Sequence, residues 1–202
     1  DETYIEDVTI ESDYTSGSVP ANTSAFILYE GGKDNRGTLK LSNMHTRGYW
    51  RQGVLVRDSA GTAYGPTKKI LIDGFYTDSG QVDYSVGIFA KDQLGQLDYV
   101  RISNCVFGTL SNGNPAITTT SNAGSGDIIE LIDIENVLIR TNGYSPTSTT
   151  NAYRFTGTSA APSNNIHLSE NITKTGITLT AIGASPSNVV TNLVAVNNYT
   201  FA

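Results

Sequence analysis

A short pattern of alternating aliphatic residues recurs along the chain about every thirty residues. Two aliphatic residues are separated by one other residue and followed by small, amide or carboxyl residues. The second aliphatic residues of the six copies are Ile10, Leu41, Ile72, Ile102, Ile134 and Leu168, at spacings of 31, 31, 30, 32 and 34 residues. Alternation with a period of two predicts strands with one apolar face. A single repeat of this size cannot bury that face, whereas stacked repeats can.

A second short strand is predicted between successive copies of the first. Each copy starts with a small residue and continues into a short, strand-like stretch. The six starting residues are Ala25, Gly53, Gly87, Ala116, Ala152 and Gly176. Two interleaved series that stay in phase predict an all-β fold, a parallel β-helix in which each strand pairs with its equivalent one repeat later. The alternative is an antiparallel β-sandwich, which gives no reason for a period of thirty residues.

Composition supports strands and excludes several classes of function. The chain holds 25 Thr, 17 Asn and 20 Gly, with 16% charged residues and a net charge of −6. Thr favours strands, and Asn and Gly favour turns. An acidic chain is a poor partner for nucleic acid, and without an apolar run of about 18 residues no membrane insertion is expected. One cysteine and two histidines predict no disulfide framework and no metal site, and we expect no cofactor.

We expect one domain over residues 1–202. The sequence begins without Met, so the chain is expected to be a piece of a longer protein. The repeat weakens after Gly183, and residues 183–202 are expected to form a C-terminal cap or closing strands. Asn-x-Ser/Thr triplets at Asn22, Asn171 and Asn198 are expected by chance in a chain this rich in Asn and Thr.

Two columns of polar residues follow from the same alignment. Asn43, Asn104 and Asn136 occupy equivalent places, which predicts a ladder of stacked amides, with Ser12 and Gly74 in the gaps. One position earlier, acidic residues alternate with serines, which keeps like charges about two coils apart. This second column is Glu11, Ser42, Asp73, Ser103, Glu135 and Ser169.

The run Val100–Phe107 (VRISNCVF) resembles the coil motif of right-handed β-helix proteins, and residues 39–44 and 132–137 resemble it more loosely. This group includes pectate lyases, polygalacturonases and bacteriophage tailspike proteins. The chain looks most like a tailspike or tail-fibre fragment. The resemblance implies a right-handed β-helix of about six coils and a homotrimer that binds a bacterial surface polysaccharide. It also implies an extracellular place on a virion tail.

Three carboxylates are the candidate catalytic residues. Glu30, Asp58 and Asp92 take equivalent places after the second strand if the alignment of that strand holds. Neighbours in such a column lie about 5 Å apart. Retaining glycosidases place two carboxyl groups about 5 to 5.5 Å apart, and inverting ones about 6.5–9.5 Å. The alternative interpretation is that these are solvated turn residues.

Aromatic residues in turns are the candidate substrate-binding residues. Trp50 is bracketed by Tyr49 and Arg51, and Tyr84 is predicted at a similar place one coil later. Aromatic planes can stack on the apolar C–H faces of sugars. Alternatively, the rings cover the core or fill a subunit interface, where Tyr and Trp are enriched.

Three hypotheses of function result. The first is a spike or fibre domain that binds a bacterial surface glycan as a homotrimer. The second is a polysaccharide hydrolase that uses Glu30, Asp58 or Asp92. The third is a structural shaft without a ligand.

Overall fold

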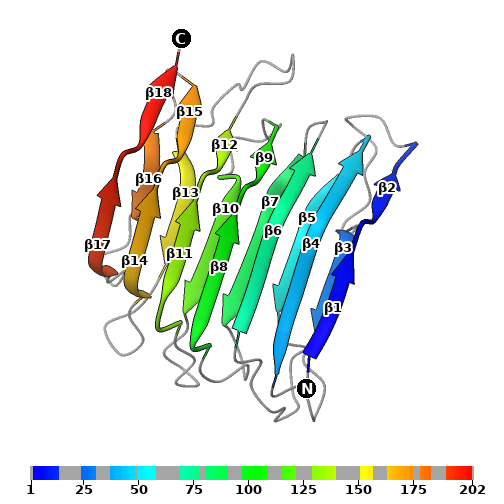
Figure 1. Cartoon of the computed structure of the whole chain (residues 1–202), viewed down its shortest axis with the longest axis horizontal. Coiled ribbons are helices and arrows are strands. Elements are labelled where there is room, and N and C mark those ends of the chain that lie inside the picture. The colour runs from blue at the N-terminus through cyan, green and yellow to red at the C-terminus, as the bar shows by residue number, and fades with distance from the viewer. Residues whose placement is uncertain are drawn as a thin grey trace.

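The computed structural model describes residues 2–13, 24–30, 37–48, 50–57, 69–77, 81–90, 97–108, 115–121, 129–139, 151–156, 163–174, 178–182 and 190–201. These residues form eighteen strands and no helix (Figure 1). The expectation of an all-β chain is therefore confirmed.

The strands belong to two sheets, here called the twelve-stranded sheet and the six-stranded sheet. The twelve-stranded sheet contains β1 (Glu2–Glu6), β2 (Thr9–Glu11), β4 (Thr38–Arg47), β6 (Lys69–Thr77), β8 (Tyr99–Ser103), β9 (Val106–Phe107), β11 (Ile132–Glu135), β12 (Leu138–Ile139), β14 (Ser163–Ser169), β15 (Ile172–Lys174), β17 (Val190–Val196) and β18 (Tyr199–Phe201). The six-stranded sheet contains β3 (Ser24–Glu30), β5 (Trp50–Arg57), β7 (Gln81–Ala90), β10 (Ile117–Ser121), β13 (Asn151–Thr156) and β16 (Thr178–Ile182).

All strand pairings of the described residues are parallel. The chain passes back and forth between the two sheets, and each visit adds a strand beside the one laid down a repeat earlier (Figure 1). The antiparallel β-sandwich is therefore wrong. The architecture is a pair of stacked, parallel sheets, which is compatible with a parallel β-helix.

The predicted interior column is correct for five of its six members. Leu41, Ile72, Ile102, Ile134 and Leu168 pair in succession across neighbouring strands, and all five are buried. Ile10 is not part of this column, because it pairs with Thr46, and Ile5 is the residue opposite Leu41. The prediction for Ile10 is wrong because each coil carries two stretches with alternating inward side chains, and Val8 and Ile10 belong to the second.

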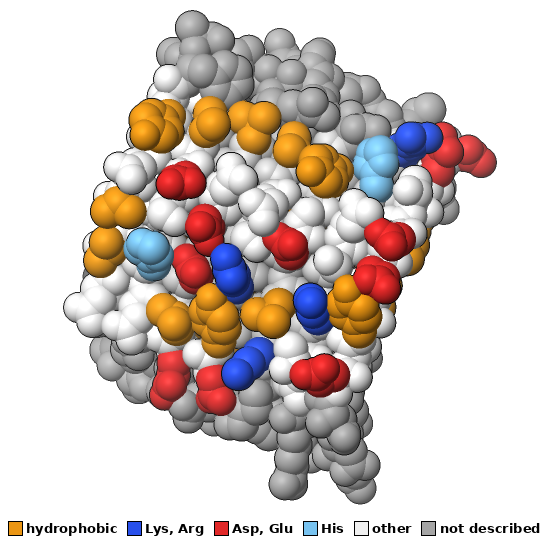
Figure 2. Space-filling model, in the orientation of Figure 1, with side chains coloured by type: hydrophobic (Ala, Val, Ile, Leu, Met, Phe, Trp, Pro, Cys, Tyr) orange, Lys and Arg blue, Asp and Glu red, His pale blue; other side chains and the backbone are white. Residues whose placement is uncertain are grey.

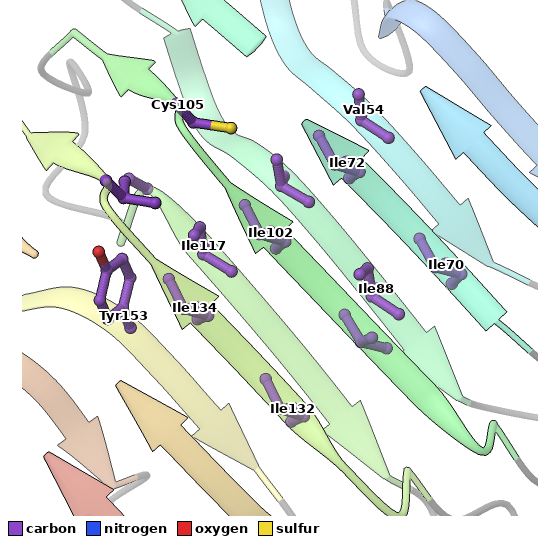
Figure 3. Packing of buried hydrophobic residues seen from close by; sticks show 14 of the residues in the cluster. Val54, Ile70, Ile72, Ile88, Ile102, Cys105, Ile117, Ile132, Ile134 and Tyr153 are labelled. Carbon is purple, nitrogen blue, oxygen red and sulfur yellow. The ribbon is translucent and has the colours of Figure 1, made fainter. Parts of the chain in front are cut away.

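The core lies between the two sheets. Figure 3 shows Ile70, Ile72, Ile102, Ile132 and Ile134 of the twelve-stranded sheet facing Val54, Ile88, Ile117 and Tyr153 of the six-stranded sheet. Each of these side chains is at most 1% exposed. Full burial of an aliphatic side chain contributes roughly 1.5–3 kcal/mol, so the stacked columns are the main source of stability.

Each coil bends within the twelve-stranded sheet at a residue with positive φ, and β14 and β17 carry a further such residue, Asn165 and Asn192. This column of bend residues consists of Asp7, Asn43, Gly74, Asn104, Asn136, Glu170 and Asn197, with φ between 50° and 68°. Gly adopts this backbone without strain, and Asn and Asp are the side chains that tolerate it best.

The bend residues carry the predicted amide ladder. Asn136 Nδ2 donates to Asn104 Oδ1 at 2.8 Å, and Asn104 Nδ2 donates to Asp73 Oδ1 at 2.7 Å. Asn43 Nδ2 donates to Asp7 Oδ1, so Asp7 holds the place that the alignment gave to Ser12. The three asparagines thus occupy equivalent places, as predicted. The amide-to-amide bond joins Asn104 and Asn136, whereas Asn43 bonds to Asp7 and is separated from Asn104 by Gly74.

The alternating acidic column needs the same correction. Register places Glu6, Ser42, Asp73, Ser103, Glu135 and Ser169 in one row. Glu11 instead pairs with Arg47 beyond the bend. Carboxylates thus still alternate with serines on the outer face, with Glu6 in the place predicted for Glu11.

Candidate functional site

The three predicted catalytic carboxylates depend on the register of the six-stranded sheet. Glu30 ends β3 and pairs with Arg57 of β5, whereas the sequence alignment had placed it beside Asp58. Asp58 and Asp92 lie outside the described residues. The alignment behind the expected 5 Å spacing is therefore wrong by one residue at this step, and catalysis by these carboxylates stays a prediction.

The predicted aromatic site is described only at Trp50. Its indole Nε1 donates to the Arg47 carbonyl oxygen at 3.0 Å, and the side chain is half-buried. Tyr49 lies outside the described residues, as do the side chains of Arg51 and Tyr84. Tyr84 of β7 pairs with Gln52 of β5, whereas Trp50 pairs with Gln81. Tyr84 therefore does not occupy the place equivalent to Trp50. Stacking of a sugar on Trp50 stays a prediction.

The described part of the chain forms a different candidate site, on the outer face of the twelve-stranded sheet. A shallow depression of about 380 Å³ crosses β4, β6 and β8. Its outward lining comprises Lys40, Leu71, Asp73, Tyr99, Arg101, Ser103 and Asn104. Figure 2 shows this face, with acidic and basic side chains lying between and below two rows of hydrophobic ones.

A polar network borders the depression on the side of β11 and β14. Tyr99 Oη donates to Asp133 Oδ2 at 3.2 Å, and His167 Nδ1 lies 3.2 Å from Asp133 Oδ1. Arg101 Nη2 donates to Glu135 Oε2 at 2.9 Å, and the side chains of this ion pair are 45% and 39% exposed. A pair so open to solvent contributes little to stability, about 0–1 kcal/mol, and its charges can be shared with a ligand.

The carboxylate of Asp73 lies within the depression and is held from one side. Its Oδ1 atom accepts hydrogen bonds from Ser103 Oγ at 2.8 Å and from Asn104 Nδ2 at 2.7 Å. These donors fix the carboxylate in place and offset part of its charge. The depression thus combines fixed acceptors and donors with the Tyr99 ring and the aliphatic side chain of Leu71.

Two groups at this site are held in their ordinary protonation states. Partial burial, followed by the nearby Asp133 carboxylate, raises the pKa of the Tyr99 hydroxyl. The hydrogen bond to Glu135 raises the pKa of the Arg101 guanidinium. Tyr99 is therefore a neutral hydrogen-bonding phenol, and Arg101 is a permanent cation. The site is suited to binding through hydrogen bonds, ring contact and charge.

Tyr99, Arg101, Asp133 and His167 did not emerge as site residues from the sequence. Three of them are the middle residues of the aliphatic pattern, as in Val100-Arg101-Ile102 and Ile132-Asp133-Ile134. A middle residue between two inward side chains must point outward. The strand register then places Leu71, Arg101, Asp133 and His167 side by side. This row of outward residues is the feature of the sequence from which the site could have been predicted.

Cys105 is the cysteine of the Val100–Phe107 motif, and its side chain is buried. Its Sγ atom donates to the Ser103 carbonyl oxygen at 3.0 Å and accepts from the Phe75 N–H at 3.4 Å. Burial raises its pKa from the ordinary value of 9.0 to about 12. Cys105 is therefore a structural thiol of the hydrophobic core.

A thiol reagent should label Cys105 only after unfolding. At pH 8 the native thiol stays protonated and buried, so we expect labelling by an aromatic disulfide reagent to be slow and to become complete in denaturant. Because the folded pKa is raised, this group's contribution to stability is present below pH 9 and is lost as the pH rises through about 12. Fast stoichiometric labelling of the native protein would contradict this placement.

No protein-family model, curated protein or solved structure matches this chain. Within the described ranges, no cluster of three or more His, Cys, Asp or Glu side chains is placed to bind a metal ion. The same residues contain no helix that is long and apolar enough to cross a membrane.

Proposed function

We propose that this chain is a right-handed parallel β-helix of about six coils, of the tailspike or tail-fibre type, and that it binds a bacterial surface polysaccharide. The parallel register at intervals of about thirty residues supports the fold. The resemblance of residues 100–107 to the β-helix coil motif supports the class. An extracellular place on a virion tail belongs to the same proposal.

The depression on the outer face is the observation that carries the proposed binding. It runs across neighbouring strands, so equivalent positions repeat at one strand spacing, about 4.8 Å. It also joins the Tyr99 ring to fixed hydrogen-bonding groups on Asp73, Ser103 and Asn104. An extended chain of sugars presents apolar ring faces and many hydroxyls, and this combination suits both.

Replacement of Tyr99 by alanine tests the proposal. We expect the wild type to bind at least one polysaccharide of a panel of bacterial capsules and O-antigens, measured by calorimetry. Tyr99→Ala should lower that affinity roughly tenfold, because truncation of a central aromatic contact typically removes more than about 1 kcal/mol. Val194→Ala is the control, since Val194 is an exposed hydrophobic residue of the same sheet that does not line the depression.

Absence of binding to every member of the panel would end the proposal and would favour a shaft without a ligand. Release of oligosaccharides that is lost in Asp58→Asn and Asp92→Asn would favour the hydrolase instead. That second candidate has no support from the register of Glu30 with Arg57.

A column of apolar side chains supports the proposed homotrimer. Just beyond the bend, Tyr76, Val106, Leu138, Ile172 and Tyr199 lie on successive strands and point outward, forming the upper row of hydrophobic side chains in Figure 2. Tyr76 is 41% exposed and Tyr199 is 60% exposed. Such a continuous apolar row on a polar face is typical of an interaction surface, and we propose that a second copy of the chain covers it.

Charges placed in this apolar column should abolish self-association. We expect the wild type to sediment as a trimer at micromolar concentration and Leu138→Lys with Ile172→Lys to sediment as a folded monomer. Leu131→Lys is the control, because Leu131 is exposed on the same face outside the column. A wild-type monomer, measured by analytical ultracentrifugation, would contradict the trimer.

A further inference from the structure

We infer that the glycan bound in the outer-face depression is acidic, with carboxylate groups on its sugar rings. This inference rests on the proposed polysaccharide binding. It names the chemical class of the polysaccharide and the cationic side chains that select it.

Two cations flank the apolar floor of the depression, and a third lies near it on the same face. Lys40, Leu71 and Arg101 pair in succession across β4, β6 and β8, so the two cations lie on either side of Leu71, with their backbones about 10 Å apart. Lys69 lies two residues before Leu71 on the same outward face and pairs with Tyr99. Figure 2 shows basic side chains gathered around hydrophobic ones at the middle of this face.

The anionic groups of the same face are engaged by neighbouring side chains. Asp73 is the carboxylate within the depression, and its Oδ1 atom already accepts two hydrogen bonds. Asp133 and Glu135 lie on the strand beyond Arg101 and pair with it, with Arg101 Nε 4.0 Å from Asp133 Oδ2 and Arg101 Nη2 2.9 Å from Glu135 Oε2. Lys40 and Arg101 are therefore the charged side chains directly beside Leu71, while Asp73 and the flanking strands carry the negative charge of this face.

The contacts of these cations leave them able to bind an anion. The Lys40 ammonium lies 4.9 Å from the centre of the Tyr4 ring, which is a cation–π contact. The Arg101 guanidinium has five N–H donors, of which one is bonded to Glu135. Arg pairs with carboxylates through two parallel bonds and Lys through a point charge. A sugar ring placed over Leu71 and Tyr99 would thus direct its carboxylate toward Lys40 or Arg101.

A matched pair of oligosaccharides tests this inference. The probes are an alginate hexasaccharide, which carries a carboxylate on each sugar, and the same hexasaccharide with its carboxyl groups reduced to alcohols. We expect the acidic probe to bind at least roughly tenfold more tightly in calorimetry, because charge-assisted hydrogen bonds are the stronger ones. The difference should shrink as salt is added, since both partners are exposed to solvent.

Variants then locate the selectivity. Lys40→Met and Arg101→Met should each lower the affinity for the acidic probe roughly tenfold and leave the reduced probe unchanged. Arg101→Lys should restore part of the affinity. Arg154→Met is the control, because Arg154 is an exposed cation of β13 in the other sheet.

Equal affinity for both probes would overturn the inference and leave polysaccharide binding in place. Unchanged binding of the acidic probe by Lys40→Met and Arg101→Met would overturn it as well. Failure of both probes together with the entire bacterial polysaccharide panel would instead overturn the proposed function.

Discussion

Replacement of Asn171 by alanine should destabilise the fold by about 3–5 kcal/mol. Asn171 is 0% exposed, and its amide uses both ends. Oδ1 accepts from the Val137 N–H and from Tyr153 Oη, each at 3.1 Å. Nδ2 donates to the Ile134 carbonyl oxygen and to Asn198 Oδ1, each at 3.0 Å. Alanine would leave three buried polar partners without a bond, each at about 1–3 kcal/mol.

Asn198 provides the comparison for this variant. It lies one coil later in the same column and donates from Nδ2 to the Leu168 carbonyl oxygen at 3.0 Å, but it is only half-buried. Its Oδ1 atom accepts from the N–H and from Nδ2 of the buried Asn171, each at 3.0 Å, and water can replace only its other contacts. Asn198→Ala should therefore cost about 1–3 kcal/mol, less than Asn171→Ala. Urea unfolding followed by circular dichroism measures both free energies. A loss below about 1 kcal/mol for Asn171→Ala would contradict the network.

Replacement of Phe75 by alanine is the second change with a large expected effect. Phe75 is 0% exposed, and its ring meets Phe107 of the next coil edge-to-face, with centroids 5.7 Å apart. Loss of a buried phenylalanine leaves a cavity and typically costs about 3–5 kcal/mol. We expect the midpoint of urea unfolding to fall accordingly, with an unchanged dependence on urea concentration.

Tyr76 is the control for Phe75 because it is the next residue in the same strand. Its side chain points outward and its ring is 41% exposed. Tyr76→Ala removes a similar ring from the surface, so its effect on the monomer should stay below about 1 kcal/mol. Similar losses for the two variants would contradict the assignment of inward and outward faces.

The sequence pattern correctly predicts an all-β chain and five of the six residues of the interior column. It misplaces the strand of the first coil. Inward positions within one coil run as Leu39, Leu41, Met44 and Thr46, because the bend residue Asn43 shifts the alternation by one. Both halves of a coil therefore show the same two-residue period. A local pattern cannot distinguish the halves, and so it wrongly assigns Val8 and Ile10 to the first half.

The second series was misaligned for a different physical reason. The pairing of β3 with β5 shifts between Ser24 and Ile27, and the pairing of β5 with β7 shifts between Trp50 and Gln52. Such irregularities add a residue to one strand and displace everything that follows. Because of the shift between Ser24 and Ile27, Glu30 pairs with Arg57 and not with Asp58.

The contacts of the outer-face site depend on register across some thirty residues. Tyr99 meets Asp133 and Arg101 meets Glu135 only because β8 and β11 pair in one specific alignment. Asn171 shows the same limit, since it was noted only as a chance triplet and is a buried amide with four side-chain hydrogen bonds. Such partners cannot be predicted from local sequence before the strands are aligned.

Pairs of introduced cysteines measure the parallel register most directly. Glu135 and Ser169 are opposite one another on β11 and β14, about one strand spacing apart, which is within the reach of a disulfide. Under mild oxidation, Glu135→Cys with Ser169→Cys should form an intramolecular disulfide, identified by mass spectrometry of peptides. Glu135→Cys with His167→Cys, offset by two residues on the same face, should stay reduced. A disulfide in the second pair but not in the first would contradict the stacked register on which the fold, the depression and the proposed function depend.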